Sequence, residues 1–99
     1  MEGPAWLSIL SAIIHERAQS GDPSSYTVKL LGRGTERIAQ KIGEEGVEVA
    51  LAAITRDVDG CAEEIADLLY HLGLLMEARG FGWNEVIAKL RERHSTRSK

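Results

Sequence analysis

Residues 35–56 read TERIAQKIGEEGVEVALAAITR, and their apolar positions recur with the period of an α-helix. Ile38, Ile42 and Val49 follow one face of this predicted helix. Glu45 falls on the same face, because it lies three residues after Ile42 and four before Val49. A second apolar row runs roughly opposite and contains Val47, Leu51 and Ile54. We therefore expect a long helix with apolar neighbours on two sides, which a dimer supplies more easily than a monomer of this length.

Four other segments carry the helical period, and no segment shows the strict alternation that is typical of strands. We expect these helices over about 4–19, 24–32, 60–79 and 84 (or 83) to 94. Ser24 or Ser25 is expected to cap the second helix and Thr35 the third, while Asp59 or Gly60 opens the fourth. The sequence thus predicts an all-α protein of about five helices, in a single domain over residues 1–99, with a disordered tail from about 95 to 99.

Composition narrows the classes of partner. Twelve Lys and Arg stand against 15 Asp and Glu, which gives a net charge of −3, so we expect neither a nucleic acid nor a membrane as partner. No apolar run approaches the roughly 20 residues that span a bilayer, and we expect a cytoplasmic protein. Cys61 is the single cysteine, which excludes an internal disulfide and a cysteine-based zinc site.

Acidic residues form two similar groups, EEGVE at 44–48 and EEIAD at 63–67. Each predicted helix carries a carboxylate pair three residues apart, Glu45 with Glu48 and Glu64 with Asp67, and such residues point the same way. If the two pairs face each other, they form a pocket of four carboxylates. Crowded like charges are costly unless a cation compensates them, and carboxylate oxygens suit Mg²⁺ or Mn²⁺. The pattern favours metal-assisted hydrolysis of a phosphoanhydride.

Other interpretations of these acids remain open. A single glutamate usually belongs to a solvated helix face, and a helical dimerisation module could carry all of them without chemistry. Repetition of the spacing on two helices favours a functional site. Either acidic group alone would be weak evidence. His71 continues the row of Glu64 and Asp67, either as a base or phosphate contact or as a hydrogen-bonded structural histidine.

Basic side chains that could meet phosphate oxygens are Lys29, Arg33, Arg37 and Lys41. Lys41 precedes Glu45 by one helical turn, so it can pair with that acid or reach a substrate. Hydroxyls of Tyr26 and Thr27 are further candidates for substrate binding, although capping and core roles are equally ordinary for such residues. No G-x-x-x-x-G-K-[ST] motif is present, which excludes a P-loop.

In these residues and their neighbours, the chain resembles the phosphoribosyl-ATP pyrophosphohydrolase family of histidine biosynthesis. The resemblance runs from about 25 to 94 and rests on five short segments: SYT at 25–27, the glycine at 34, KIGEEGVEV at 41–49, EIADLLYHL at 64–72 and RH at 93–94. A looser frame, E-E-x-x-E followed by E-x-x-D, is shared with the wider all-helical NTP pyrophosphohydrolases that include MazG. The alternative function is therefore a MazG-like enzyme that hydrolyses free nucleoside triphosphates.

The resemblance implies hydrolysis of 1-(5-phosphoribosyl)-ATP at the α-β phosphoanhydride, with Mg²⁺, to phosphoribosyl-AMP and pyrophosphate. It assigns the metal to Glu45, Glu48, Glu64 and Asp67, and it makes Glu44 an outer ligand or water-orienting base. Substrate contacts are expected from the other candidates, Lys41, His71, Lys29, Arg33, Tyr26 and Thr27. It also implies a homodimer in which helical hairpins build a four-helix-bundle core, with the sites near the subunit interface.

Overall fold

The computed structural model describes residues 3–95, and nearly all of these residues are helical. A short 3₁₀ helix, η1 (Gly3–Ala5), leads into five α-helices: α1 (Trp6–Ser20), α2 (Tyr26–Arg33), α3 (Thr35–Thr55), α4 (Val58–Arg79) and α5 (Trp83–Arg93). No strand occurs within the described range, and the predicted all-α fold is confirmed. The predicted disordered tail falls, apart from Ser95, outside the described residues.

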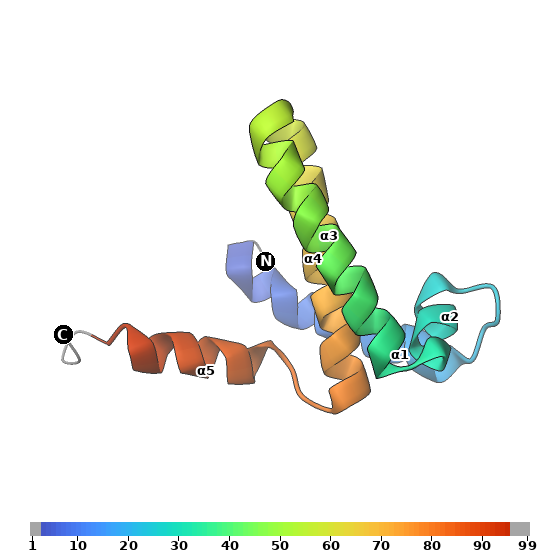
Figure 1. Cartoon of the computed structure of the whole chain (residues 1–99). Helices are drawn as coiled ribbons and strands as arrows, with labels where there is room; N and C mark the ends of the chain where they lie inside the picture. Colours follow the sequence, from blue (N-terminus) through green and yellow to red (C-terminus); the bar gives the residue numbers. More distant parts are fainter. Residues whose placement is uncertain (1–2, 96–99) are drawn as a thin grey trace.

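Helices α3 and α4 form the longest feature of the molecule, an antiparallel hairpin (Figure 1). Two residues connect them, and the second, Asp57, caps α4 by accepting a 2.9 Å hydrogen bond from the Gly60 N–H. The predicted opening of this helix at Asp59 or Gly60 was wrong, because the Asp57 carboxylate already satisfies a free N–H of the first turn and the helix begins at Val58. The hairpin sets the acidic segments of α3 and α4 opposite each other.

Helix α2 lies beside the beginning of α3 (Figure 1). Ser25 caps it by accepting from the Val28 N–H, which confirms one of the two predicted caps. In the preceding connector, the backbone N–H and the hydroxyl of Ser24 both donate to Asp22, and these bonds lower the pKa of the Asp22 carboxyl.

A single residue, Gly34, turns the chain from α2 into α3 with φ +94°, a backbone conformation that favours glycine. The predicted cap at Thr35 was wrong, since Gly34 occupies the capping position and Thr35 is the first helical residue. The abrupt turn brings the basic side chains of α2 close to the first two turns of α3.

The core lies where α1, α2, α3 and α4 meet, at the end of the hairpin formed by the start of α3 and the end of α4. The buried apolar cluster takes one residue from each of α1 to α4, namely Ile14, Leu30, Ile38 and Leu74, and each of these is at most 5% exposed. Gly73 allows α1 and α4 to approach closely, since a Cβ there would lie 2.7 Å from the Ile14 Cδ1 atom. This core holds α2 against α3 and α4.

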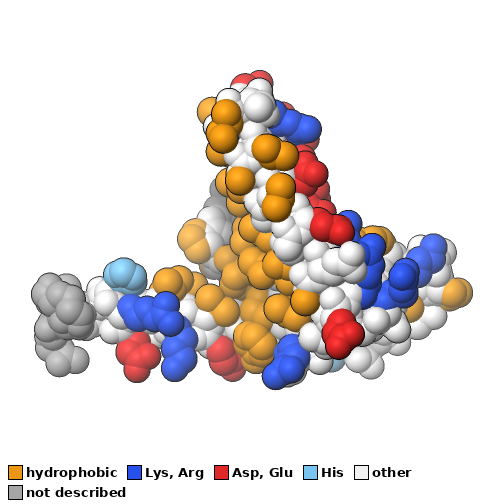
Figure 2. Space-filling view, in the orientation of Figure 1, with side chains coloured by type: hydrophobic (Ala, Val, Ile, Leu, Met, Phe, Trp, Pro, Cys, Tyr) orange, Lys and Arg blue, Asp and Glu red, His pale blue; other side chains and the backbone are white. Residues whose placement is uncertain are grey.

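Apolar side chains remain exposed along the outer half of the hairpin (Figure 2). The second apolar row of α3 is exposed by 58%, 53% and 83% at Val47, Leu51 and Ile54, and Val58 is 87% exposed. Among residues 3–95 this second row of α3 is left uncovered, and the expected dimer stays a prediction. None of the helices described has both the length and the apolar character that crossing a bilayer requires.

Candidate active site

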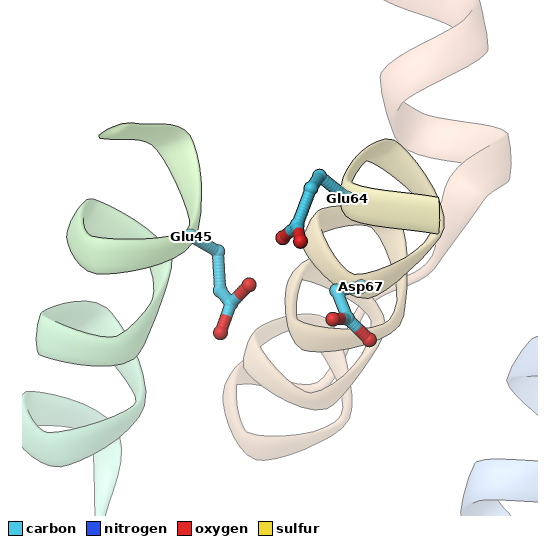
Figure 3. Close-up of side chains that lie close together, drawn as sticks. All are labelled: Glu45, Glu64 and Asp67. Atoms are coloured by element: carbon cyan, nitrogen blue, oxygen red, sulfur yellow. The ribbon is translucent and has the colours of Figure 1, made fainter. Parts of the chain in front are cut away.

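Three carboxylates converge between the two helices of the hairpin. Glu45 reaches from α3 toward Glu64 and Asp67 of α4 (Figure 3), and one carboxylate oxygen of each lies within 4.8 Å of the others. The Glu45 and Glu64 side chains are only 13% and 17% exposed, whereas Asp67 is exposed. Because Glu45 occupies the inward row of α3, antiparallel packing directs it at the i, i+3 pair of α4.

Two cations flank the cluster of Glu45, Glu64 and Asp67. The Lys41 Nζ atom lies 3.6 Å from the Glu45 carboxylate, and an Arg56 guanidinium nitrogen lies 3.4 Å from the Glu64 carboxylate. No ion pair reaches Asp67 within residues 3–95. The cluster thus has more carboxylates than cations, and its oxygen donors suit a hard divalent ion such as Mg²⁺ or Mn²⁺.

The other two predicted acids lie outside this cluster. Glu48 is exposed one turn further along α3, and its oxygens are not part of the 4.8 Å group. Glu44 is also exposed and accepts a 3.4 Å hydrogen bond from the Gln40 side chain. The structure therefore brings together three of the four carboxylates expected to hold metal.

A basic pocket of about 210 Å³ lies between α2 and α3. Its lining consists of Tyr26, Lys29, Leu30, Arg33, Arg37 and Lys41. Figure 2 shows Lys and Arg side chains gathered on the side of the molecule where α2 lies. Four cations around one small pocket suit the oxygens of a phosphate chain. Since Lys41 also contacts Glu45, the basic pocket adjoins the acidic cluster.

All four basic side chains that the sequence offers for phosphate oxygens line this pocket, Arg37 among them. These side chains are regularly spaced, since Lys29, Arg33, Arg37 and Lys41 recur every four residues. That spacing places cations on one face of each helix, and the turn at Gly34 brings the two faces together.

Tyr26 and Thr27 of α2 each hydrogen-bond a side chain of α4, namely His71 and Tyr70. The Tyr26 hydroxyl lies 2.7 Å from the His71 Nε2 atom, and the His71 Nδ1 atom lies 2.8 Å from the Asp67 carbonyl oxygen. Thr27 is buried and hydrogen-bonds the Tyr70 hydroxyl. Tyr26 lines the basic pocket. The Thr27 hydroxyl and both ring nitrogens of His71 are engaged in hydrogen bonds within the protein.

A sequence model of the family described as phosphoribosyl-ATP pyrophosphohydrolase matches residues 7–94. The chain belongs to this family. The match includes the three clustered acids and the four pocket cations. It also reaches back through α1, beyond the segment from about 25 to 94 that the motifs covered. Ile14 places α1 in the same buried core as residues of α2, α3 and α4.

Relatives of this phosphoribosyl-ATP pyrophosphohydrolase family member include three proteins named histidine biosynthesis bifunctional protein HisIE. The one from Vibrio cholerae serotype O1 is 53% identical over 89 residues, covering 90% of this chain and 42% of the relative. The one from Pasteurella multocida is 49% identical over 94 residues, covering 93% of this chain and 47% of the relative. The one from Campylobacter jejuni is 47% identical over 89 residues, covering 90% of this chain and 43% of the relative. The chain spans less than half the length of these curated relatives.

Proposed function

We propose that this chain is a divalent-metal-dependent phosphoribosyl-ATP diphosphatase. Its reaction would convert 1-(5-phosphoribosyl)-ATP and water to 1-(5-phosphoribosyl)-AMP and pyrophosphate, the second step of histidine biosynthesis. The observation that carries the proposal is the contact between Lys41 and Glu45, which joins a four-cation pocket to a three-carboxylate cluster in a chain of this family.

Binding begins in the basic pocket. Lys29 and Arg33 of α2 and Arg37 of α3 would hold phosphate oxygens through charge-assisted hydrogen bonds. Tyr26 lines the same pocket and offers an aromatic face beside the phosphates. Because Lys41 stands at the edge nearest Glu45, the phosphate chain would extend from the pocket toward the carboxylates.

Glu45, Glu64 and Asp67 would hold Mg²⁺ or Mn²⁺, which when bound neutralises phosphate charge and polarises the phosphoryl oxygens. Glu48 extends the carboxylate row of α3 and is a fourth candidate ligand. Glu44, on the neighbouring exposed position, is the acid that we propose to orient the attacking water.

With pyrophosphate as the leaving group, water would attack the α-phosphorus, the bond from that phosphorus to the bridging oxygen would break, and the bridging oxygen would depart with pyrophosphate. Negative charge that moves onto the pyrophosphate is stabilised by Lys41 and the arginines of the pocket, which are in place before the reaction. The four cations therefore serve both substrate binding and the departure of the product.

The proposed assembly is a homodimer in the cytoplasm. Exposed Val47, Leu51, Ile54 and Val58 form an apolar row along the hairpin, and two hairpins packed through this row would create a four-helix core. The net charge of −3 disfavours nucleic acid or an anionic membrane as the partner, and the local basic pocket supports a small-molecule nucleotide instead.

The test compares initial rates of pyrophosphate release from phosphoribosyl-ATP, ATP and a set of dNTPs, each with Mg²⁺ and with excess chelator. We expect the highest kcat/KM for phosphoribosyl-ATP and no release with chelator. Faster turnover of dNTPs would favour the MazG-like alternative. Absence of release from every nucleotide would leave only a binding or dimerisation role.

A further inference from the structure

Two consecutive residues of α2 hydrogen-bond two consecutive residues of α4. Tyr26 contacts His71, with 2.7 Å between the hydroxyl oxygen and Nε2, and Thr27 contacts the Tyr70 hydroxyl. The rings also pack, since the Tyr26 and Tyr70 centroids lie 6.4 Å apart and Tyr26 meets His71 edge-on at 5.7 Å. Helix α2 has eight residues, too few to be stable alone, so its position depends on such contacts.

The partners of His71 determine which atom donates and which accepts in each of its two hydrogen bonds. The Asp67 carbonyl oxygen can only accept, so His71 Nδ1 carries the proton and donates to it across 2.8 Å. In the neutral imidazole, Nε2 then accepts from the Tyr26 hydroxyl. Because His71 is 5% exposed, water cannot readily replace either bond.

This chain of bonds connects the two halves of the site. Tyr26 lines the basic pocket, and Asp67 belongs to the acidic cluster. Lys29 and Arg33 follow Tyr26 by three and seven residues, which places them on the same face of α2. A rotation or shift of α2 that released Tyr26 from His71 would therefore move both pocket cations relative to the Asp67 turn.

We propose that His71 is a positioning residue that acts through Tyr26, holding the phosphate-binding face of α2 in a fixed place relative to the acidic turn of α4. The proposal rests on the proposed function only in taking the basic pocket as the phosphate site. It assigns His71 neither a proton-transfer role nor a direct substrate contact, because both ring nitrogens are engaged within the protein. Tyr26 is the link that reaches the pocket.

The experiment pairs Tyr26→Phe with Tyr70→Phe in the full chain. Each change removes one hydroxyl from the same α2–α4 contact, but Tyr70 does not line the pocket. Binding of inorganic pyrophosphate with Mg²⁺ is measured by calorimetry, and the melting temperature is measured beside it. We expect both variants to melt at lower temperature by similar amounts. Tyr26→Phe should weaken pyrophosphate binding about fivefold and Tyr70→Phe less than about twofold.

A second variant examines the other end of the chain of bonds. The amide nitrogen of asparagine can replace Nδ1 as donor to the Asp67 carbonyl but does not reach Tyr26, so His71→Asn should weaken pyrophosphate binding as Tyr26→Phe does. The double variant Tyr26→Phe/His71→Asn should bind pyrophosphate no more weakly than either single variant, because each substitution removes the same interaction. ¹⁵N NMR of the unmodified protein should show a protonated Nδ1 and an unprotonated Nε2 at His71.

Three results would overturn the proposal: pyrophosphate affinity unchanged in Tyr26→Phe, an equal loss in Tyr70→Phe, or an unprotonated Nδ1. These results are distinct from failure of the proposed function. If phosphoribosyl-ATP is not hydrolysed but Tyr26→Phe alone weakens pyrophosphate binding, the positioning role stands without the reaction. If hydrolysis occurs and the two tyrosine variants bind pyrophosphate alike, the positioning role is wrong and the reaction stands.

Discussion

The Lys41 ammonium lies one helical turn from the Glu45 carboxylate, with 3.6 Å between the Nζ atom and the nearest oxygen. Each partner belongs to a different half of the site, since Lys41 lines the basic pocket and Glu45 belongs to the acidic cluster. Both side chains are partly shielded from water, at 24% and 13% exposure. One turn of α3 therefore holds the point at which phosphate oxygens and carboxylates would meet.

Replacing Lys41 with methionine should lower kcat/KM about tenfold to a hundredfold, because one charge-assisted contact to the phosphates and the partner of Glu45 are both lost. Methionine keeps the length of the side chain and most of its packing. Lys89→Met on α5, where the side chain is 71% exposed, is the matched control and should keep full activity. Equal rates for the Lys41→Met and unmodified proteins would remove Lys41 from the mechanism.

Glu64 and Glu63 are neighbours on α4, and only Glu64 belongs to the acidic cluster. Glu64→Gln should reduce the hydrolysis rate at least about a hundredfold, because a carboxylate that would hold the cation is gone. Its melting temperature should stay the same or rise, since removing one of three crowded charges relieves repulsion. Glu63→Gln is the control. If both variants lose activity equally, the cluster is not the metal site.

Leu51 is 53% exposed in the middle of the apolar row on α3. Leu51→Glu should convert a dimer to a monomer in sedimentation velocity, because a buried, unpaired carboxylate is costly at an interface. Ala88→Glu adds the same charge at an exposed position of α5 and should leave the dimer intact. The proposed assembly is wrong if the unmodified chain sediments as a monomer or if Leu51→Glu remains a dimer.

Gly73 and Ile14 give a test of the core. A Cβ at position 73 would lie 2.7 Å from the Ile14 Cδ1 atom, and Ile14 is fully buried. Gly73→Ala should therefore lower the free energy of unfolding by about 1 kcal/mol, since overpacking outweighs the gain in helix propensity. Ile14→Val removes the crowded methyl group, so the double variant should recover most of that loss in urea denaturation. Additive losses would show that the two helices do not meet at these residues.

Much of the fold follows from short-range features of the sequence. Helical periodicity locates the five α-helices but not the short 3₁₀ helix at Gly3–Ala5, and the cap at Ser25 and the end of α4 at Arg79 were both predictable. The errors at Asp59 and Thr35 lie at helix starts, where neighbouring residues compete for one capping position. Gly34 occupies its position because its positive φ turns the chain into α3, and Asp57 occupies its position because its carboxylate accepts from the Gly60 N–H.

The site was less predictable because it depends on contacts between helices. Helical phase placed Glu45 on the inward row of α3, and the structure sets it against Glu64 and Asp67. The phase of α3 alone could not separate Glu48 from Glu45, because their relation to α4 depends on how the hairpin packs. The hydrogen bond between Tyr26 and His71 joins residues 45 positions apart, so no local pattern indicates it.

The central claim is that this chain cleaves the α-β phosphoanhydride of phosphoribosyl-ATP. The most direct measurement is a ³¹P NMR time course of the purified chain with phosphoribosyl-ATP and Mg²⁺. We expect the triphosphate signals to be replaced by those of pyrophosphate and phosphoribosyl-AMP in equal amounts, and excess chelator to stop the change. Release of orthophosphate with a nucleoside diphosphate, or spectra that stay unchanged with Mg²⁺, would contradict it.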